Sequence, residues 1–145
     1  MRVGFIGLGS IGTPMAKQIA AAGFPMTVHD VREEAASTLL DMGATWADSP
    51  AAVARECDTV CTCLPGPAEM ERVVLGDDGI LTGATAGTVY IDHTTNSPSM
   101  AQRIQGLLAE RSVEMLDAPV SGGKERAETR DMTVLVGGAE STFEK

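Results

Sequence analysis

The chain has 145 residues, 43% of them hydrophobic, and a formal net charge of −9 from 20 acidic and 11 basic residues. This length fits one domain with a real hydrophobic core. A surface that tracks nucleic-acid phosphates needs clustered Lys and Arg, but this chain has three lysines and no basic run, which excludes a nucleic-acid partner. No apolar stretch approaches the roughly twenty residues that cross a bilayer, and the first expected strand leaves no room for a signal sequence. We therefore expect a cytoplasmic protein without membrane contact.

The first residues combine a short apolar run with Gly7, Gly9 and Gly12 in G-x-G-x-x-G spacing. In this pattern Gly7 permits a tight turn, Gly9 lets a pyrophosphate approach the backbone, and Gly12 lets the next helix pack closely on the strand. The helix N-terminus then offers free N–H groups and a partial positive charge. The spacing alone is weak evidence, because a chain with 16 glycines will contain such a pattern by chance.

The context of the glycines strengthens this interpretation. We expect a strand over residues 2–6, an amphipathic helix ending near Gly23, and a strand over residues 26–29. The second strand is followed by Asp30, roughly twenty residues after Gly7, where an acid that binds an adenosine ribose is expected. The alternative is a glycine-rich turn in an ordinary α/β protein.

Helical and extended patterns continue to alternate along the chain. The expected helices lie at residues 33–42, 50–57, 69–75 and 98–111, and the expected strands at residues 45–47, 59–64, 88–92, 113–117 and 133–136. Ser49 and Ser97 each precede a proline and are expected N-caps. Strands separated by such helices predict a fold of the α/β class, a doubly wound parallel sheet of the Rossmann type.

Polar or glycine-rich segments follow five of the expected strands, at residues 7–12, 30, 64–65, 92–96 and 121–123. The carboxyl ends of parallel strands meet at one edge of a sheet, where ligands of such folds bind. We therefore expect these segments to form one site.

The opening segment, residues 3–12 followed by Pro14-Met15-Ala16, resembles that of the 3-hydroxyacid dehydrogenase family. Segments 64–65, 76–81, 90–98 and 117–123 match the family in the same order, and the last, Asp-Ala-Pro-Val-Ser-Gly-Gly, is the most specific. The resemblance covers nearly the whole chain. It implies a nucleotide-binding domain whose second, all-helical domain is absent from this chain.

The resemblance also implies a set of cofactor-binding residues, which are Gly7, Leu8, Gly9, Ser10, Ile11, Gly12, Asp30, Leu64, Pro65 and Thr95. The glycine loop would cradle the pyrophosphate, Asp30 would hold the adenosine ribose, and Thr95 would lie near the nicotinamide. Ser121, Gly122 and Gly123 would bind a small carboxylate substrate through a hydroxyl and uncovered N–H groups. A simple tight turn is the alternative for these three residues.

The choice of cofactor depends on Asp30. A carboxylate at the ribose position repels a 2′-phosphate, so the expected cofactor is NAD. Arg32, two residues further on, is a candidate cofactor residue that could pair with that phosphate, so NADP stays as an alternative. The other interpretation of Arg32 is a solvated side chain at a helix start.

The family's general acid/base is a lysine in a long helix beyond the nucleotide-binding domain. Lys17 is expected on a helix surface, Lys145 lies too early, and Lys124 lies near the site without further support. We therefore expect no catalytic residue in this chain, and we interpret residues 1–145 as a dinucleotide-binding domain that is incomplete at its C-terminus. The longer parent would be a homo-oligomer that transfers a hydride between NAD(P) and a small 3-hydroxy acid or its semialdehyde. The alternatives are a non-catalytic dinucleotide-binding or interaction module and an S-adenosylmethionine-dependent methyltransferase.

Three further groups invite interpretation. Cys57, Cys61 and Cys63 lack the spacing of metal ligands, so we expect buried free thiols and no metal site. His29 is expected to pack near the adenine, and His93 has no partner that would make it a base. Residues 124–131, where the family often has glycines but this chain has Arg126 and Arg130, are expected to form a charged, solvated loop; the alternative is a segment that bends differently or recognises a more acidic substrate.

Overall fold

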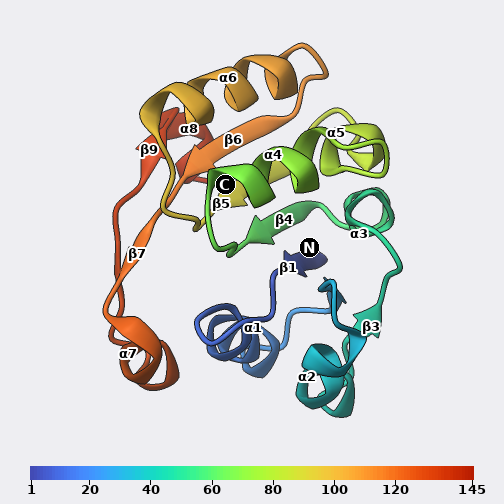
Figure 1. Cartoon of the computed structure of the whole chain (residues 1–145), viewed down its shortest axis with the longest axis vertical. Coiled ribbons are helices and arrows are strands. Elements are labelled where there is room, and N and C mark those ends of the chain that lie inside the picture. Colours follow the sequence, from blue (N-terminus) through green and yellow to red (C-terminus); the bar gives the residue numbers. More distant parts are fainter.

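The computed structural model describes all 145 residues, and it places seven strands in one sheet (Figure 1). The order across the sheet is β3-β2-β1-β4-β5-β6-β9. The strands are β1 Val3–Ile6, β2 Met26–His29, β3 Thr45–Trp46, β4 Thr59–Thr62, β5 Val89–Asp92, β6 Glu114–Asp117 and β9 Gly137–Gly138. All neighbours pair in parallel except β6 and β9, so the predicted doubly wound parallel sheet is confirmed.

Helices cover both faces of the sheet (Figure 1). They are α1 Gly12–Ala21, the 3₁₀ turn Glu33–Ala36, α2 Ser37–Asp41, α3 Pro50–Glu56, α4 Pro67–Leu75, α5 Ile80–Gly83, α6 Pro98–Ala109, α7 Gly123–Thr129 and α8 Glu140–Phe143. Buried residues of α1 and α2 pack on one face of β1 and β2, whereas those of α3 to α6 pack on the opposite face around the fully buried Tyr90. None of the helices is long and apolar enough to cross a membrane.

The two expected N-caps are confirmed. The Ser49 hydroxyl accepts a hydrogen bond from Ala52 N (3.2 Å), and the Ser97 hydroxyl accepts one from Met100 N (3.3 Å). Each cap satisfies one of the otherwise unpaired N–H groups of a helix start. These contacts begin α3 and α6, which both lie on the side of the sheet away from α1.

The C-terminal quarter differs from the prediction in two places. The strand expected over residues 133–136 is shorter than predicted: only β8 (Thr133–Val134) forms, and it pairs with β7 (Val120–Ser121) in a separate ribbon. The next strand, β9, begins beyond the expected range and pairs antiparallel with β6. Beyond β8, Leu135 N donates to Pro119 O (3.1 Å), so the contact with the segment of β7 continues for one residue. Residues 124–131 do not form the expected loop, because most of them belong to α7, whose Ala127 is buried.

Candidate functional site

The β1–α1 loop gives each of the three glycines a separate spatial role. Gly7 has φ +94°, and a Cβ there would lie 2.4 Å from Cys63 O. A Cβ on Gly12 would lie 1.9 Å from Gly7 O, so only glycine lets α1 begin this close to β1. A Cβ on Gly9 would meet no atom within 4 Å, because the backbone there faces open space. The loop therefore leaves room for a ligand against the backbone of Gly9.

The loop ends in an uncapped helix N-terminus. Ile11 at the N-cap provides no side-chain hydrogen bond, and the first turn of α1 contains no acidic residue. The N–H groups of residues 9–12 donate to no protein acceptor. Thr13 holds the loop in place, since its Oγ1 donates to Leu8 O (2.8 Å) and its N–H donates to Gly9 O (3.0 Å). Four unpaired N–H groups at the positive end of a ten-residue helix suit a pyrophosphate.

Asp30 lies directly beside this loop, because β2 pairs with β1. Its Oδ2 accepts from Leu8 N (2.7 Å) and its Oδ1 from Arg32 N (3.0 Å), which fixes both carboxylate oxygens. The remaining lone pairs of the carboxylate can accept hydrogen bonds from hydroxyl groups of a ligand. The Arg32 guanidinium Nε is 3.8 Å from Asp30 Oδ1, but its side chain is 62% exposed. Such an exposed contact is weak, so Arg32 is free to move.

The segments after β4 and β5 lie on the other side of β1 from Asp30. Leu64 is half-buried, whereas Pro65 and Thr95 are exposed. Leu64 N donates to the hydroxyl of the buried Thr94 (3.1 Å), which connects the two segments. The structure therefore brings the glycine loop, Asp30, Leu64-Pro65 and Thr95 to the carboxyl edge of four neighbouring strands.

Ser121, Gly122 and Gly123 form an exposed turn between β7 and α7. Gly122 and Gly123 have φ values of +137° and +69°, conformations that glycine adopts without strain. Both glycines are exposed, which is compatible with an anion approaching their N–H groups. The turn is followed by α7, which packs beside α1 rather than on the sheet (Figure 1).

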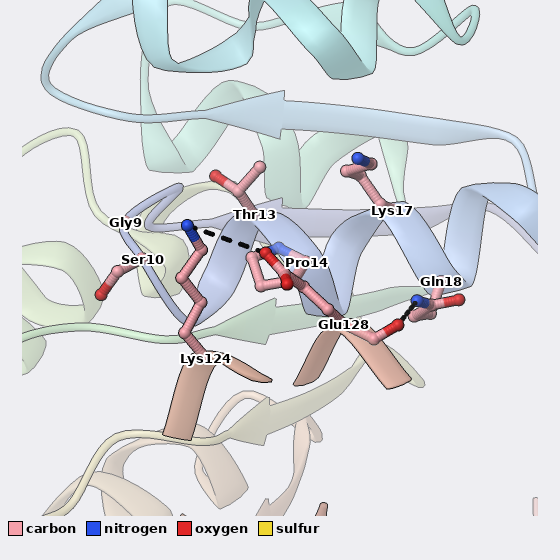
Figure 2. Close-up of a pocket in the computed structure, with 8 residues that line it drawn as sticks. All are labelled: Gly9, Ser10, Thr13, Pro14, Lys17, Gln18, Lys124 and Glu128. Atoms are coloured by element: carbon pink, nitrogen blue, oxygen red, sulfur yellow. Dashed lines mark hydrogen bonds and ion pairs between the residues drawn. The ribbon is translucent and has the colours of Figure 1, made fainter. Parts of the chain in front are cut away.

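A hollow of about 370 Å³ separates α7 from the first turns of α1 (Figure 2). Its lining comes from both helices and from the glycine loop, and consists of Gly9, Ser10, Thr13, Pro14, Lys17, Gln18, Lys124 and Glu128. Lys124 Nζ lies 3.7 Å from Glu128 Oε1. Gln18 joins the helices at both ends of its amide: Nε2 donates to Glu128 O (2.9 Å) and Oε1 accepts from Arg130 Nε (2.5 Å).

The two histidines occupy structural positions. His93 Nδ1 contacts Ala118 O (2.9 Å), and burial lowers the pKa of this imidazole because it disfavours the charged form. His29 Nδ1 contacts Ala47 O (2.8 Å), and its ring centroid lies 5.3 Å from that of Trp46. The predicted packing of His29 near an adenine stays a prediction.

All three cysteines are free thiols, as expected, but only Cys57 and Cys61 are buried, whereas Cys63 is half-buried. Burial raises the pKa of Cys61 to about 12 and that of Cys63 to about 11, so neither is a reactive thiolate near neutral pH. Cys63 also contributes the carbonyl oxygen that a side chain at Gly7 would meet. The contact that Cys63 makes with the glycine loop is therefore made by its backbone and not by its thiol.

Asp92 belongs to the expected site segment 92–96 but has no individual predicted role, and in the structure it is a fully buried carboxylate at the end of β5. Its hydrogen-bond partners are Thr62 of β4 and, from the segment after β5, Thr94 and Asn96. An acid ending an apolar strand was visible in the sequence. Its pairing with Thr62 across the sheet depends on strand register, which the sequence alone does not supply.

Residues 2–145 match the family model for the NAD binding domain of 6-phosphogluconate dehydrogenase. The chain is 37% identical to the NAD-dependent L-serine dehydrogenase of Pseudomonas aeruginosa, covering 99% of this chain and 48% of the relative. It is also 37% identical to mitochondrial 3-hydroxyisobutyrate dehydrogenase of Mus musculus, covering 97% of this chain and 42% of the relative.

The fold agrees with these sequence matches. The solved 3-hydroxyisobutyrate dehydrogenase of Salmonella typhimurium superposes with a TM-score of 0.92 at 32% identity, covering 99% of this chain and 50% of that one. The chain thus spans about half the length of the relatives that it matches. The resemblance to 3-hydroxyacid dehydrogenases is confirmed. The chain belongs to the family of the NAD binding domain of 6-phosphogluconate dehydrogenase.

Proposed function

We propose that this chain binds NAD with the pyrophosphate on the N–H groups of residues 9–12, and that it serves as the cofactor-binding portion of an oxidoreductase. The observation that carries the proposal is the uncapped start of α1 beneath the open space at Gly9. The cofactor, when bound, supplies a nicotinamide ring that accepts or delivers a hydride. The residues of this chain bind that cofactor and orient it.

The remaining site residues receive roles from their positions in the sheet. Asp30 accepts hydrogen bonds from the adenosine ribose, while Leu64, Pro65 and Thr95 contact the nicotinamide half. The exposed turn of Ser121, Gly122 and Gly123 binds the carboxylate of the substrate. The support for these roles is that all the segments follow the carboxyl ends of strands, where ligands of open α/β sheets bind.

NAD is the proposed cofactor rather than NADP. Two backbone N–H groups hold the Asp30 carboxylate in place, so a 2′-phosphate would meet a negative charge that cannot turn away. Arg32 has one exposed contact with Asp30 and could rotate toward a phosphate. NADP is therefore the weaker alternative.

The proposed substrate of the whole enzyme is a small 3-hydroxy acid or its semialdehyde, as the names of the relatives suggest. No side chain of this chain is assigned as the general acid or base. Lys17 and Lys124 are exposed at the rim of the hollow, and Lys145 contacts Glu114 far from the glycine loop. We assign that role to a residue of the longer parent.

Residues 1–145 are proposed to be the dinucleotide-binding domain of that parent, which we propose to be a cytoplasmic homo-oligomer. The exposed hydrophobic side chains near the C-terminus, which include Leu135 and Phe143, support contact with a further domain or subunit. A non-catalytic module is less favoured, because the relatives carry the names of dehydrogenases. A methyltransferase would leave the Ser-Gly-Gly turn without a role.

The proposal is tested by calorimetric titration of the chain with NADH. In Gly9→Val the added side chain enters open space in the free protein, so folding should be unchanged while pyrophosphate binding is blocked. Gly106→Ala is the matched control, since a Cβ at this glycine also meets no atom but lies on α6. We expect binding by the wild type and by Gly106→Ala, and none by Gly9→Val. Equal binding by a folded Gly9→Val variant would refute the assigned position.

A further inference from the structure

A buried chain of hydrogen bonds runs along the ends of β4 and β5. The Tyr90 and Thr62 hydroxyl oxygens are 2.8 Å apart, and Thr62 Oγ1 donates to Asp92 Oδ1 (2.7 Å). Because the Thr62 proton is directed to Asp92, Tyr90 donates to Thr62. All three residues have no exposed surface. The chain therefore ends on a carboxylate that lies wholly within the protein.

Asp92 also organises the backbone beyond the strands. Its Oδ1 accepts from Thr94 N (3.0 Å), and its Oδ2 accepts from Asn96 Nδ2 (3.4 Å). The hydroxyl of Thr94, itself 1% exposed, accepts from Leu64 N (3.1 Å). Asp92 is thus connected through Thr94 to the segment that follows the neighbouring strand.

Burial of the Asp92 carboxylate costs folding free energy, and an apolar residue at this position would avoid that cost. Its donors are hydroxyl, amide and backbone N–H groups, and no Lys or Arg forms an ion pair with it. Burying a charge without an opposite charge is unfavourable, and well-packed apolar residues often serve stability as well or better. Fully satisfied buried networks do, however, fix one arrangement of the groups around them.

The groups that this network fixes lie where the second half of a dinucleotide would be. If the ribose is held by Asp30 at the end of β2 and the pyrophosphate by the loop after β1, the nicotinamide half extends over β4 and β5. We propose that Asp92 and Thr94 are positioning residues for the nicotinamide half of the cofactor. They act through Leu64-Pro65 and Thr95 and do not touch the cofactor themselves. This inference rests on the proposed function.

Substitution of Thr94 should therefore weaken the binding of NAD⁺ more than that of ADP-ribose. Thr94→Val removes the hydroxyl that accepts from Leu64 N with little change in volume, whereas Thr94→Ser keeps a hydroxyl. The loss of one hydrogen bond that orders the contact surface should weaken NAD⁺ binding by about fivefold. Binding of ADP-ribose, which lacks the nicotinamide, should change by less than about twofold. Thr94→Ser should restore the wild-type ratio.

Thr88→Val is the matched control. Thr88 is also a buried threonine whose hydroxyl accepts from a backbone N–H, that of Thr85 (3.3 Å), but it precedes β5 at the opposite edge of the sheet. This variant loses a comparable hydrogen bond and should leave the ratio of the NAD⁺ and ADP-ribose dissociation constants unchanged. Thermal unfolding, followed by circular dichroism, verifies that each variant is folded at the temperature of titration.

Asp92→Asn provides a second, independent variant. Its amide keeps one acceptor for Thr62 and Thr94 but presents an N–H₂ group to the Asn96 amide donor. We expect the same selective weakening of NAD⁺. Equal weakening of both ligands, or no change in either, in Thr94→Val and Asp92→Asn would overturn the inference. If the wild-type chain bound neither ligand, the proposed function itself would fail, and the two failures are therefore distinguishable.

Discussion

Replacement of Gly12 by alanine tests the account of the glycine loop through stability rather than through binding. The new Cβ would lie 1.9 Å from Gly7 O, 3.1 Å from Gly7 C and 3.2 Å from a ring carbon of Phe5. Neither neighbour can yield easily, because the first two atoms are backbone and Phe5 is completely buried. The start of α1 must therefore move away from β1.

The size of the effect follows from the cost of overpacking. Extra volume in a packed interior costs about 1–3 kcal/mol, and a clash with backbone belongs at the upper end, so we expect about 3 kcal/mol. For a domain of this size, this loss corresponds to a fall in Tm of about 10 °C. The assay is thermal unfolding followed by circular dichroism, together with a urea titration at 25 °C.

Two glycines with open surroundings provide the comparison. Gly9→Ala should leave the free energy of unfolding within about 0.5 kcal/mol of the wild type while weakening NADH binding. Gly106→Ala, within α6, should raise it by about 0.5–1 kcal/mol, because alanine favours the helix. A Gly12→Ala chain as stable as the wild type would refute the close approach of α1 to β1, and with it the shape of the phosphate loop.

Two further predictions concern charge. Asp30→Ser removes the carboxylate proposed to hold the ribose, so the affinity for NAD⁺ should fall and that for NADP⁺ should rise. Titration with both cofactors measures this change, and an unchanged preference for NAD⁺ would contradict the role of Asp30. His93 has a pKa below its ordinary value of 6.5, so the unfolded chain takes up a proton before the folded chain does. Its stabilising contribution is full above about pH 6.5 and is lost as the pH falls, by at most about 1.4 kcal/mol per pH unit. Urea midpoints between pH 7.5 and 5 should thus fall less steeply in His93→Asn, and parallel slopes would show that His93 is not the group responsible.

The first βαβ unit could be predicted from the sequence because its constraints are local. Gly12 is required by atoms of Gly7 and Phe5, only a few residues away, and Ser49 caps the helix that it precedes. The family motif at residues 117–123 likewise placed the exposed Ser-Gly-Gly turn after a strand. In each case a short stretch of sequence contains the residues that determine the geometry.

The features that were missed depend on contacts distant in sequence. α7 appears as a charged loop in the sequence, because only Ala127 is buried and the helix is held by Gln18 and Arg130, which are far apart along the chain. The strand expected at residues 133–136 ends at Val134 in β8, which pairs with β7, and β9, which pairs with β6, begins only at Gly137. The role of Asp92 depends on the register that sets it opposite Thr62.

The central claim is that uncovered N–H groups at the start of α1 hold the pyrophosphate of NAD. A crystal structure of this chain grown with NADH tests it most directly. We predict phosphate oxygens about 2.7–3.2 Å from the backbone nitrogens of Ser10 and Ile11, with the ribose hydroxyls on Asp30. A dinucleotide bound elsewhere, with the space above Gly9 empty, would contradict the account.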